Sequence, residues 1–170
     1  MTTTISIWKR VALTSFVLSL AATSFTATSL AAAEIGAHRH EPGASPSTLK
    51  LNDGKKWASD APLRKGMENI RAAMASALPA IHANKLSSAK YNELANKVNN
   101  EVAGIVANCK LDPQADVQLH LIIADILSGV EAMQGKTKGT KRQTGAVTVI
   151  GALEKYDVYF DHPGWKPITH

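Results

Sequence analysis

Apolar residues recur at helical spacing in four segments of the chain. The first segment begins after Asp60, which suits an N-cap, and it carries Pro62 in its first turn. Pro79 is expected to kink or end this helix. Apolar side chains three and four positions apart place one continuous stripe along it. The stripe consists of Leu63, Met67, Ile70, Met74, Leu78 and Ile81.

The other three segments show the same kind of boundaries. The second is expected to start at Ser87 or Ser88, the third at the Asp112-Pro113 pair and the fourth near Thr144. Gly135 follows the third segment, and Pro163-Gly164 stops the fourth. The three stripes are Tyr91, Leu94, Val98, Val102, Ile105 and Cys109; Leu119, Ile122, Ile123, Ile126, Val130 and Met133; and Ala146, Val149, Ile150, Leu153, Tyr156, Asp157 and Phe160.

These four amphipathic segments predict a helical bundle over residues 57–165. An amphipathic helix is not stable alone, because its apolar stripe must be buried against a neighbour. The connections between the segments are short, which favours antiparallel neighbours. No run of strict alternation indicates a sheet. The predicted fold is therefore all-α, an antiparallel up-down-up-down four-helix bundle.

Residues 1–33 have the pattern of a secretory signal peptide. Lys9 and Arg10 precede an apolar stretch, VALTSFVLSLAATSF, which ends in SLAAA with small residues at Ala31 and Ala33. The Ser and Thr content argues against a membrane span. We expect cleavage after Ala33, export to the periplasm and no stable membrane anchor afterwards.

The segments that flank the bundle lack hydrophobic periodicity. Residues 34–56 are rich in Gly, Pro, Ser and His and predict a flexible arm that carries His38 and His40. Residues 166–170 form a C-terminal tail.

Charge changes the picture little. Without residues 1–33, the remaining 137 of the 170 residues hold 17 Lys and Arg against 14 Asp and Glu, a net charge of +3 with neutral His. This small and scattered surplus argues against nucleic acid as a partner. The run KTKGTKR, residues 136–142, is either a solvated loop or a docking patch for an acidic partner.

The chain has a single cysteine, Cys109, which excludes an internal disulfide.

The predicted topology gathers metal-binding side chains at one end of the bundle. Helix rise places Met67 about 10 Å and His120 about 12 Å in from the starts of the first and third helices. Cys109 and His162 lie near the same end of the predicted bundle, and the arm is connected to that end. Thioether, thiolate and imidazole are ligands that suit copper. The candidate metal ligands are His38, His40, Met67, His120 and His162.

Each candidate ligand also has a structural interpretation. Met67 lies at the centre of a core stripe, where methionine commonly serves packing. His120 falls about 110° from the centre of its stripe, which is typical of a hydrogen-bonded boundary residue. His38 and His40 can be exposed tail residues.

Several stretches resemble known exported proteins. PLRKGMENIRAAM, LHLIIADILSGVEAM and a last helix ending in aromatic residues and histidine resemble the soluble periplasmic b-type cytochromes. The resemblance implies an antiparallel four-helix bundle with haem held between Met67 and His162. Helical phase, however, places Phe160 on the inner face and His162 on the opposite side, unless the chain unwinds before Pro163. LNDGKKW, PLRKGM and YFDHPGW are similar to segments of a group of exported proteobacterial proteins, which implies compartment and fold only.

No catalytic motif is recognisable, so we expect a non-enzymatic protein. The nucleophile elbow, H-E-x-x-H, P-loop and dinucleotide fingerprints are absent, and the absence of C-x-x-C-H excludes covalent haem of the c′ type. The functional hypothesis is an exported protein that binds or buffers a metal such as copper. The alternatives are a cofactor-free structural or protein-interaction bundle and a b-type haem electron carrier. Candidate partners are the metal ion and a second copy of the chain in a homodimer.

Overall fold

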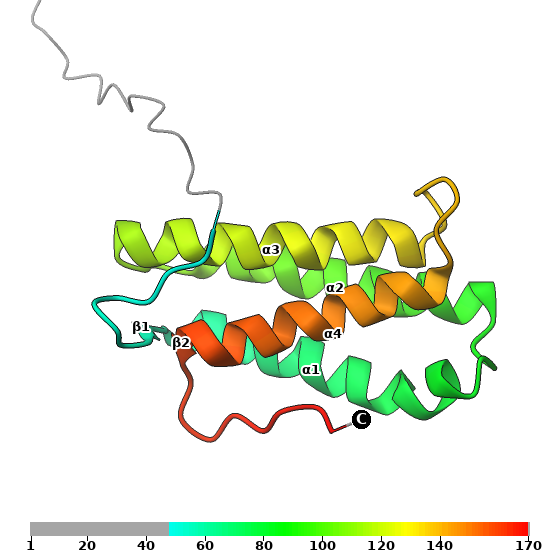
Figure 1. Cartoon of the computed structure of the whole chain (residues 1–170), viewed down its shortest axis with the longest axis horizontal. Coiled ribbons are helices and arrows are strands. Elements are labelled where there is room, and N and C mark those ends of the chain that lie inside the picture. The colour runs from blue at the N-terminus through cyan, green and yellow to red at the C-terminus, as the bar shows by residue number, and fades with distance from the viewer. Residues whose placement is uncertain (1–47, 170) are drawn as a thin grey trace, which may run out of the picture. The chain divides into compact units, whose positions relative to one another are not determined.

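The computed structural model describes residues 48–169, and this part of the chain is mostly helical (Figure 1). Four helices, α1 (Ala61–His82), α2 (Ser88–Asn108), α3 (Pro113–Met133) and α4 (Arg142–Tyr159), are accompanied by two strands of two residues each, β1 (Trp57–Ala58) and β2 (Phe160–Asp161). The predicted all-α class is confirmed. The predicted signal peptide, residues 34–47 of the predicted arm and His170 lie outside the described residues.

Local sequence signals set three of the four helix starts. Asp60 accepts a hydrogen bond from the Leu63 amide at 2.8 Å, Ser87 from the Lys90 amide at 3.3 Å and Asp112 from the Gln114 amide at 2.9 Å. Helix α4 differs, because its N-cap is Lys141, which makes no side-chain capping bond. Its start at Arg142 is two residues earlier than the predicted one.

Helix α1 runs through Pro79 to His82, so the proline does not end it. A proline removes one backbone hydrogen bond and crowds the preceding turn, so Pro79 costs free energy in the last turn of α1. Leu78 and Ile81, which lie on either side of Pro79, are both buried. Their burial favours the helical path that keeps both side chains in the core.

The predicted apolar stripes form one core. Every apolar residue predicted for the four stripes is buried except Cys109, which is half-buried at the end of α2. Helices α3 and α4 approach each other closely at Gly129 and Gly145. A Cβ atom on Gly129 would lie 2.6 Å from the Gly145 carbonyl oxygen, and one on Gly145 would lie 2.5 Å from that of Gly129. The two glycines are therefore required by this contact.

Helix α1 contacts α2 and α4, and α3 contacts the same two helices. At one end, which we call the strand end, the Lys110 amide after α2 donates to Oδ2 of Asp60 before α1 at 2.6 Å, and β1 pairs in parallel with β2 after α4. At the other end, which we call the loop end, Gln143 Nε2 donates to the carbonyl oxygen of Ile81 at 3.0 Å. The strand end comprises residues 48–60, 108–116 and 156–165, and the loop end comprises 82–93 and 131–143.

Residues 48–56, which fall in the predicted arm, are attached to α3. The Lys50 amide donates to Oε1 of Gln118 at 2.8 Å, and the Trp57 indole donates to the Lys50 carbonyl oxygen at 2.7 Å. Gln118 and Trp57 are both buried and need these partners. Among the described helices, none is long and apolar enough to cross a membrane.

Candidate functional site

An open cleft of 610 Å³ lies at the strand end, between β1 and the connection from α2 to α3. Both the residues around β1 and those from Lys110 to Ala115 line it. Its chemistry is mixed, since an indole, amides, carboxylates and an ammonium group converge on it. A smaller hollow of 320 Å³ shares three of its residues, Asn52, Trp57 and Gln114. The polar and aromatic residues of the cleft are Asn52, Trp57, Ser59, Asp60, Lys110, Asp112 and Gln114.

Asp60 joins two segments that meet in this cleft. Its Oδ1 caps α1 by accepting from Leu63, and its Oδ2 accepts from the amide of Lys110. Each carboxylate oxygen therefore satisfies one backbone donor, one at the start of α1 and one after the end of α2. The sequence predicted the cap, but the bond to Lys110 joins residues 50 positions apart.

Cys109 lies beside Asp60 and has an unreactive thiol. Burial, and after it the negative charges of the Asp60 and Asp116 carboxylates, raise its pKa to about 11. Because thiolate is the form that attacks electrophiles and binds metals, this cysteine is a poor nucleophile and a poor ligand near neutral pH. Its environment is that of a structural thiol.

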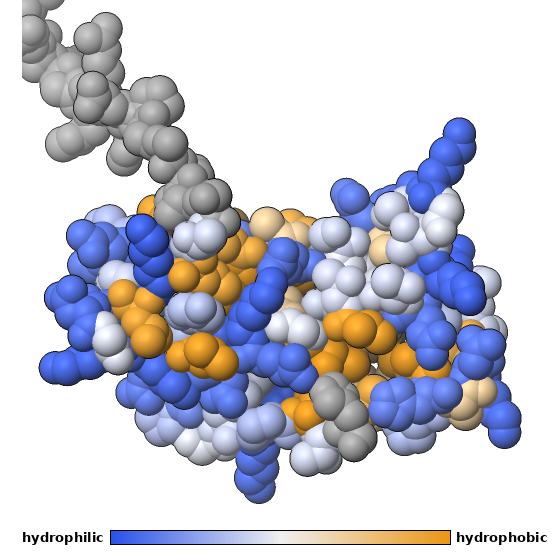
Figure 2. All heavy atoms as spheres, viewed as in Figure 1, coloured by the Kyte–Doolittle hydropathy of each residue, from blue (hydrophilic) through white to orange (hydrophobic). Residues whose placement is uncertain are grey.

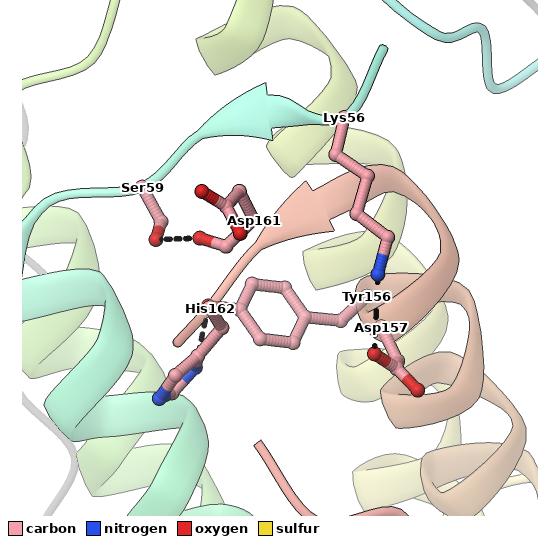
Figure 3. A network of polar contacts seen from close by, with 6 residues as sticks. All are labelled: Lys56, Ser59, Tyr156, Asp157, Asp161 and His162. Carbon is pink, nitrogen blue, oxygen red and sulfur yellow. Dashed lines mark hydrogen bonds and ion pairs between the residues drawn. The ribbon is translucent and has the colours of Figure 1, made fainter. Parts of the chain in front are cut away.

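A second polar group joins the end of α4 to β1, as Figure 3 shows. The Tyr156 hydroxyl lies 3.0 Å from Nδ1 of His162, and Tyr156 is fully buried. Burial raises the pKa of the Tyr156 phenol, so the phenol stays protonated and donates this bond when the His162 proton is on Nε2. Nearby, the Ser59 hydroxyl donates to the Asp161 carbonyl oxygen, and Arg64 donates to that of Ser59.

His162 sits in an aromatic contact. Its ring centroid lies 5.0 Å from that of Trp165, which in turn lies 5.0 Å from that of Tyr156. Burial lowers the pKa of His162, although the Glu68 carboxylate opposes the effect. On the outer side of the same helix end, Lys56 and Asp157 form an ion pair at 3.4 Å.

The chain unwinds before Pro163, which is the alternative in which helical phase does not set the orientation of His162. Helical phase placed it away from the core, but α4 ends at Tyr159 and the chain is extended over Phe160 and Asp161. Residues in extended conformation alternate sides, so His162 turns back toward Tyr156 instead of continuing the helix. Phe160 is fully buried, as its place on the inner face predicted.

The remaining predicted ligands occupy different environments. Met67 is fully buried in the core. His120 lies on the solvent side of α3, where its Nδ1 is 2.8 Å from the Asp116 carbonyl oxygen and 64% of its side chain is exposed. His38 and His40 lie outside the described residues. A core position and a solvent-facing one do not share an ion, so Met67 and His120 are not brought together.

Within residues 48–169, no group of three or more His, Cys, Asp and Glu side chains is placed to hold a metal ion. The cleft residues Asn52, Ser59 and Gln114 were missed by the sequence reasoning, because they lie in segments without periodicity or next to a cap. One signal was available. Asp60 and Asp112 are both N-caps, and the predicted topology places the starts of the first and third helices at the same end.

Comparison of the chain with protein-family models, with curated proteins and with solved structures gave no match. The resemblance to b-type cytochromes therefore stays a prediction, and the site has to be judged from its geometry.

Proposed function

We propose that this protein is an exported, non-enzymatic bundle without a cofactor, which binds an extended segment of a partner polypeptide in the cleft at the strand end. The observation that carries the proposal is the position of β1. Trp57, Ala58 and Ser59 line the cleft, whereas the residues of β2 do not. One edge of β1 pairs with β2, and the partner segment would add along the other edge.

The walls of the cleft suit the side chains of such a segment. Lys110 is exposed and offers a cation, while Asp112 offers a carboxylate at the start of α3. Asn52 and Gln114 add amides that can both donate and accept hydrogen bonds. Trp57 supplies an apolar floor, with its indole N–H already satisfied by the Lys50 carbonyl. Mixed polar walls around an aromatic anchor are typical of partner-binding surfaces.

We infer an antiparallel up-down-up-down bundle as the architecture that presents this cleft. The polar contacts at the two ends support it. The start of α1 meets the ends of α2 and α4, and the start of α4 meets the ends of α1 and α3, where Arg142 donates to the Met133 carbonyl oxygen. Such pairs of ends are expected when each helix reverses the direction of the last.

The filling of the core supports a bundle without haem or metal. Met67 is packed among apolar side chains, and Tyr156 and Phe160 stack at 5.5 Å between ring centroids where α4 ends. A haem or an ion between the helices would have to displace such side chains. The raised pKa of Cys109 argues against this thiol as a nucleophile near neutral pH.

The proposal is tested by site-specific photo-crosslinking in cells. A benzoylphenylalanine at Gln114 in the cleft is expected to give one defined adduct with another polypeptide, whereas the same residue at Lys97, exposed on α2, gives none. The adduct should vanish when Lys110→Glu and Asp112→Lys reverse the charges of the cleft walls. Equal adducts from both positions, or an adduct that survives the charge reversal, would contradict the proposal.

A further inference from the structure

The positive charge of the described chain is concentrated at the loop end. Residues 48–169 contain sixteen Lys and Arg against twelve Asp and Glu, a surplus of four. Residues 82–93 and 131–143 contain six of the basic and two of the acidic residues, so the whole surplus lies there. The rest of the described chain is balanced. The small net charge of the sequence therefore hides a polarised molecule.

Two connections that lie far apart in the sequence form this basic end. Nη1 of Arg142 donates to Oδ1 of Asn92 at 2.8 Å, and Nε2 of Gln134 donates to Oδ1 of Asn96 at 3.0 Å. These bonds hold the start of α4 and the end of α3 against the start of α2. Figure 2 shows mostly hydrophilic side chains at this end, some of them projecting.

Four lysines of the loop end are available to a partner: Lys85, Lys136, Lys138 and Lys141. All four are exposed, and none forms an ion pair with any residue that the structure describes. The other two cations are engaged, since Lys90 pairs with Glu93 at 2.6 Å and Arg142 is bound by Asn92 and Met133. We call the four the lysine cluster.

The lysine cluster is suited to a diffuse anionic surface. An ammonium group is a hydrated point charge on a flexible stem, whereas shaped recognition of single phosphates or carboxylates favours the fork of arginine. Gly135 and Gly139 adopt positive φ angles in the connection that carries three of the four lysines. This connection turns out from the helices and presents its charges without a shared pocket among them.

Apolar groups lie directly behind the lysine cluster. A hollow of 270 Å³ between the last turns of α1 and the first turns of α4 is lined by Leu78, Ile81, His82, Gln143, Val147 and Ile150. Val147 is 59% exposed. An aromatic residue for base stacking is lacking on the described surface here, because Tyr91 is 5% exposed. Cations beside apolar surface match a lipid headgroup layer better than a nucleic acid.

We propose that the loop end docks on an anionic lipid bilayer through the lysine cluster, with Val147 and the hollow behind it against the interfacial region. Each basic residue near an anionic membrane strengthens binding by about fivefold. Four together suffice for reversible adsorption. The cleft lies at the opposite end of the helices, so a docked molecule keeps it open to a partner. The proposal stands independently of what the cleft binds.

The test is co-sedimentation of the purified chain with vesicles of phosphatidylcholine and phosphatidylglycerol, and with vesicles of phosphatidylcholine alone. The test variant is Lys85→Gln, Lys136→Gln, Lys138→Gln and Lys141→Gln combined. The matched control carries Lys55→Gln, Lys65→Gln, Lys97→Gln and Lys166→Gln, which removes the same charge from exposed positions elsewhere. All proteins have the same N-terminus, and melting curves establish that each is folded.

We expect the wild type to bind the anionic vesicles at low salt and to be released at about 1 M salt, where the screening length is about 3 Å. The test variant should bind several hundredfold more weakly, at about fivefold for each lysine, and the control less than about fivefold more weakly. A variant with arginine at the four test positions should bind like the wild type.

Three outcomes would overturn the proposal. In the first, the wild type binds neutral and anionic vesicles equally. In the second, the control loses as much binding as the test variant. In the third, the wild type binds neither kind of vesicle but binds polyglutamate or duplex DNA. That result would mean that the lysine cluster binds an acidic macromolecule.

Discussion

Asp60 is the residue on which the strand end depends most. One of its oxygens caps α1 and the other holds the segment after α2, so both backbone donors lose their partner if the side chain is removed. Asp112 offers a comparison within the same chain, because it also caps a helix but its side chain accepts only from the Gln114 amide among residues 48–169.

Asp60→Ala is expected to lower the free energy of unfolding more than Asp112→Ala. Loss of the cap costs about 1 kcal/mol, and leaving the Lys110 amide without an acceptor costs about 1 kcal/mol or more in addition. Urea unfolding of both variants measures the difference. Equal losses would mean that the bond from the Lys110 amide contributes nothing to the free energy of unfolding.

Asp60→Ala should also speed alkylation of Cys109, because the substitution removes a negative charge that raises the pKa of the thiol.

His162 links stability to pH. Its pKa is lowered in the folded protein, mainly by burial, whereas the unfolded chain takes up a proton near the ordinary value of about 6.5. The unfolded state therefore binds more protons in this window. The stabilisation is complete above about pH 6.5 and is lost as the pH falls toward the folded pKa.

We expect the melting temperature of the wild type to fall more between about pH 7.5 and pH 5.5 than that of His162→Asn. The amide of asparagine can still accept from Tyr156 but does not titrate. His82 and His120 are exposed and remain in both proteins, so they cancel in the comparison. Parallel pH profiles for the two proteins would contradict this role of His162.

At the scale of elements, the contact between α3 and α4 depends on two glycines that face each other. Gly129 and Gly145 approach each other's backbone so closely that no side chain fits. Gly151, on the same helix as Gly145, has no neighbouring atom within 4 Å of a Cβ position. Packing therefore requires glycine at positions 129 and 145, whereas Gly151 only weakens its helix.

Gly129→Ala is therefore expected to destabilise the protein by about 1–3 kcal/mol or more, because backbone atoms cannot move aside. Gly151→Ala should stabilise it by about 0.5–1 kcal/mol through helix propensity alone. Thermal or urea unfolding measures both. A stabilised Gly129→Ala variant would show that α3 and α4 do not approach as described.

Some helix boundaries are set by neighbouring residues, and others are set by residues that are distant in the sequence. The starts of α1, α2 and α3 follow from a capping residue within three positions of the bond it makes, and the sequence predicted all three. The end of α4 does not follow in this way. Phe160 and Asp161 leave the helix to pair with Trp57 and Ala58, 103 positions away. This pairing decided that the helix unwinds before Pro163, and with it the orientation of His162.

At the scale of the whole molecule, the described structure bears on the copper and haem hypotheses through Met67. A fully buried Met67 can serve as a ligand only if the core opens around it. Under our proposal, protein purified from its native source lacks a Soret band and stoichiometric copper. Adding copper should not shift the melting temperature more in the wild type than in a variant with His38→Ala and His40→Ala.

A ligand that binds the folded state at a hundred times its Kd stabilises it by about 2.7 kcal/mol, so such a shift would be visible. Met67→Leu is the matched control for the core, because it conserves volume and should cost less than about 1.5 kcal/mol. A shift that Met67→Leu abolishes would restore a metal site inside the helices. A shift abolished only by the two arm substitutions would place it on the arm.

The sequence by itself determined the helical class, three helix starts and the apolar residues of the core. These features depend on hydrophobic periodicity and on hydrogen bonds within one helical turn, and both are determined by residues that are close in the sequence. The tertiary structure alone decided the second bond of Asp60, the direction of His162, the contact of Gly129 with Gly145 and the cleft beside β1. It also gathered the lysine cluster from two connections. Each of these joins residues that are distant in sequence, and only packing brings them within reach.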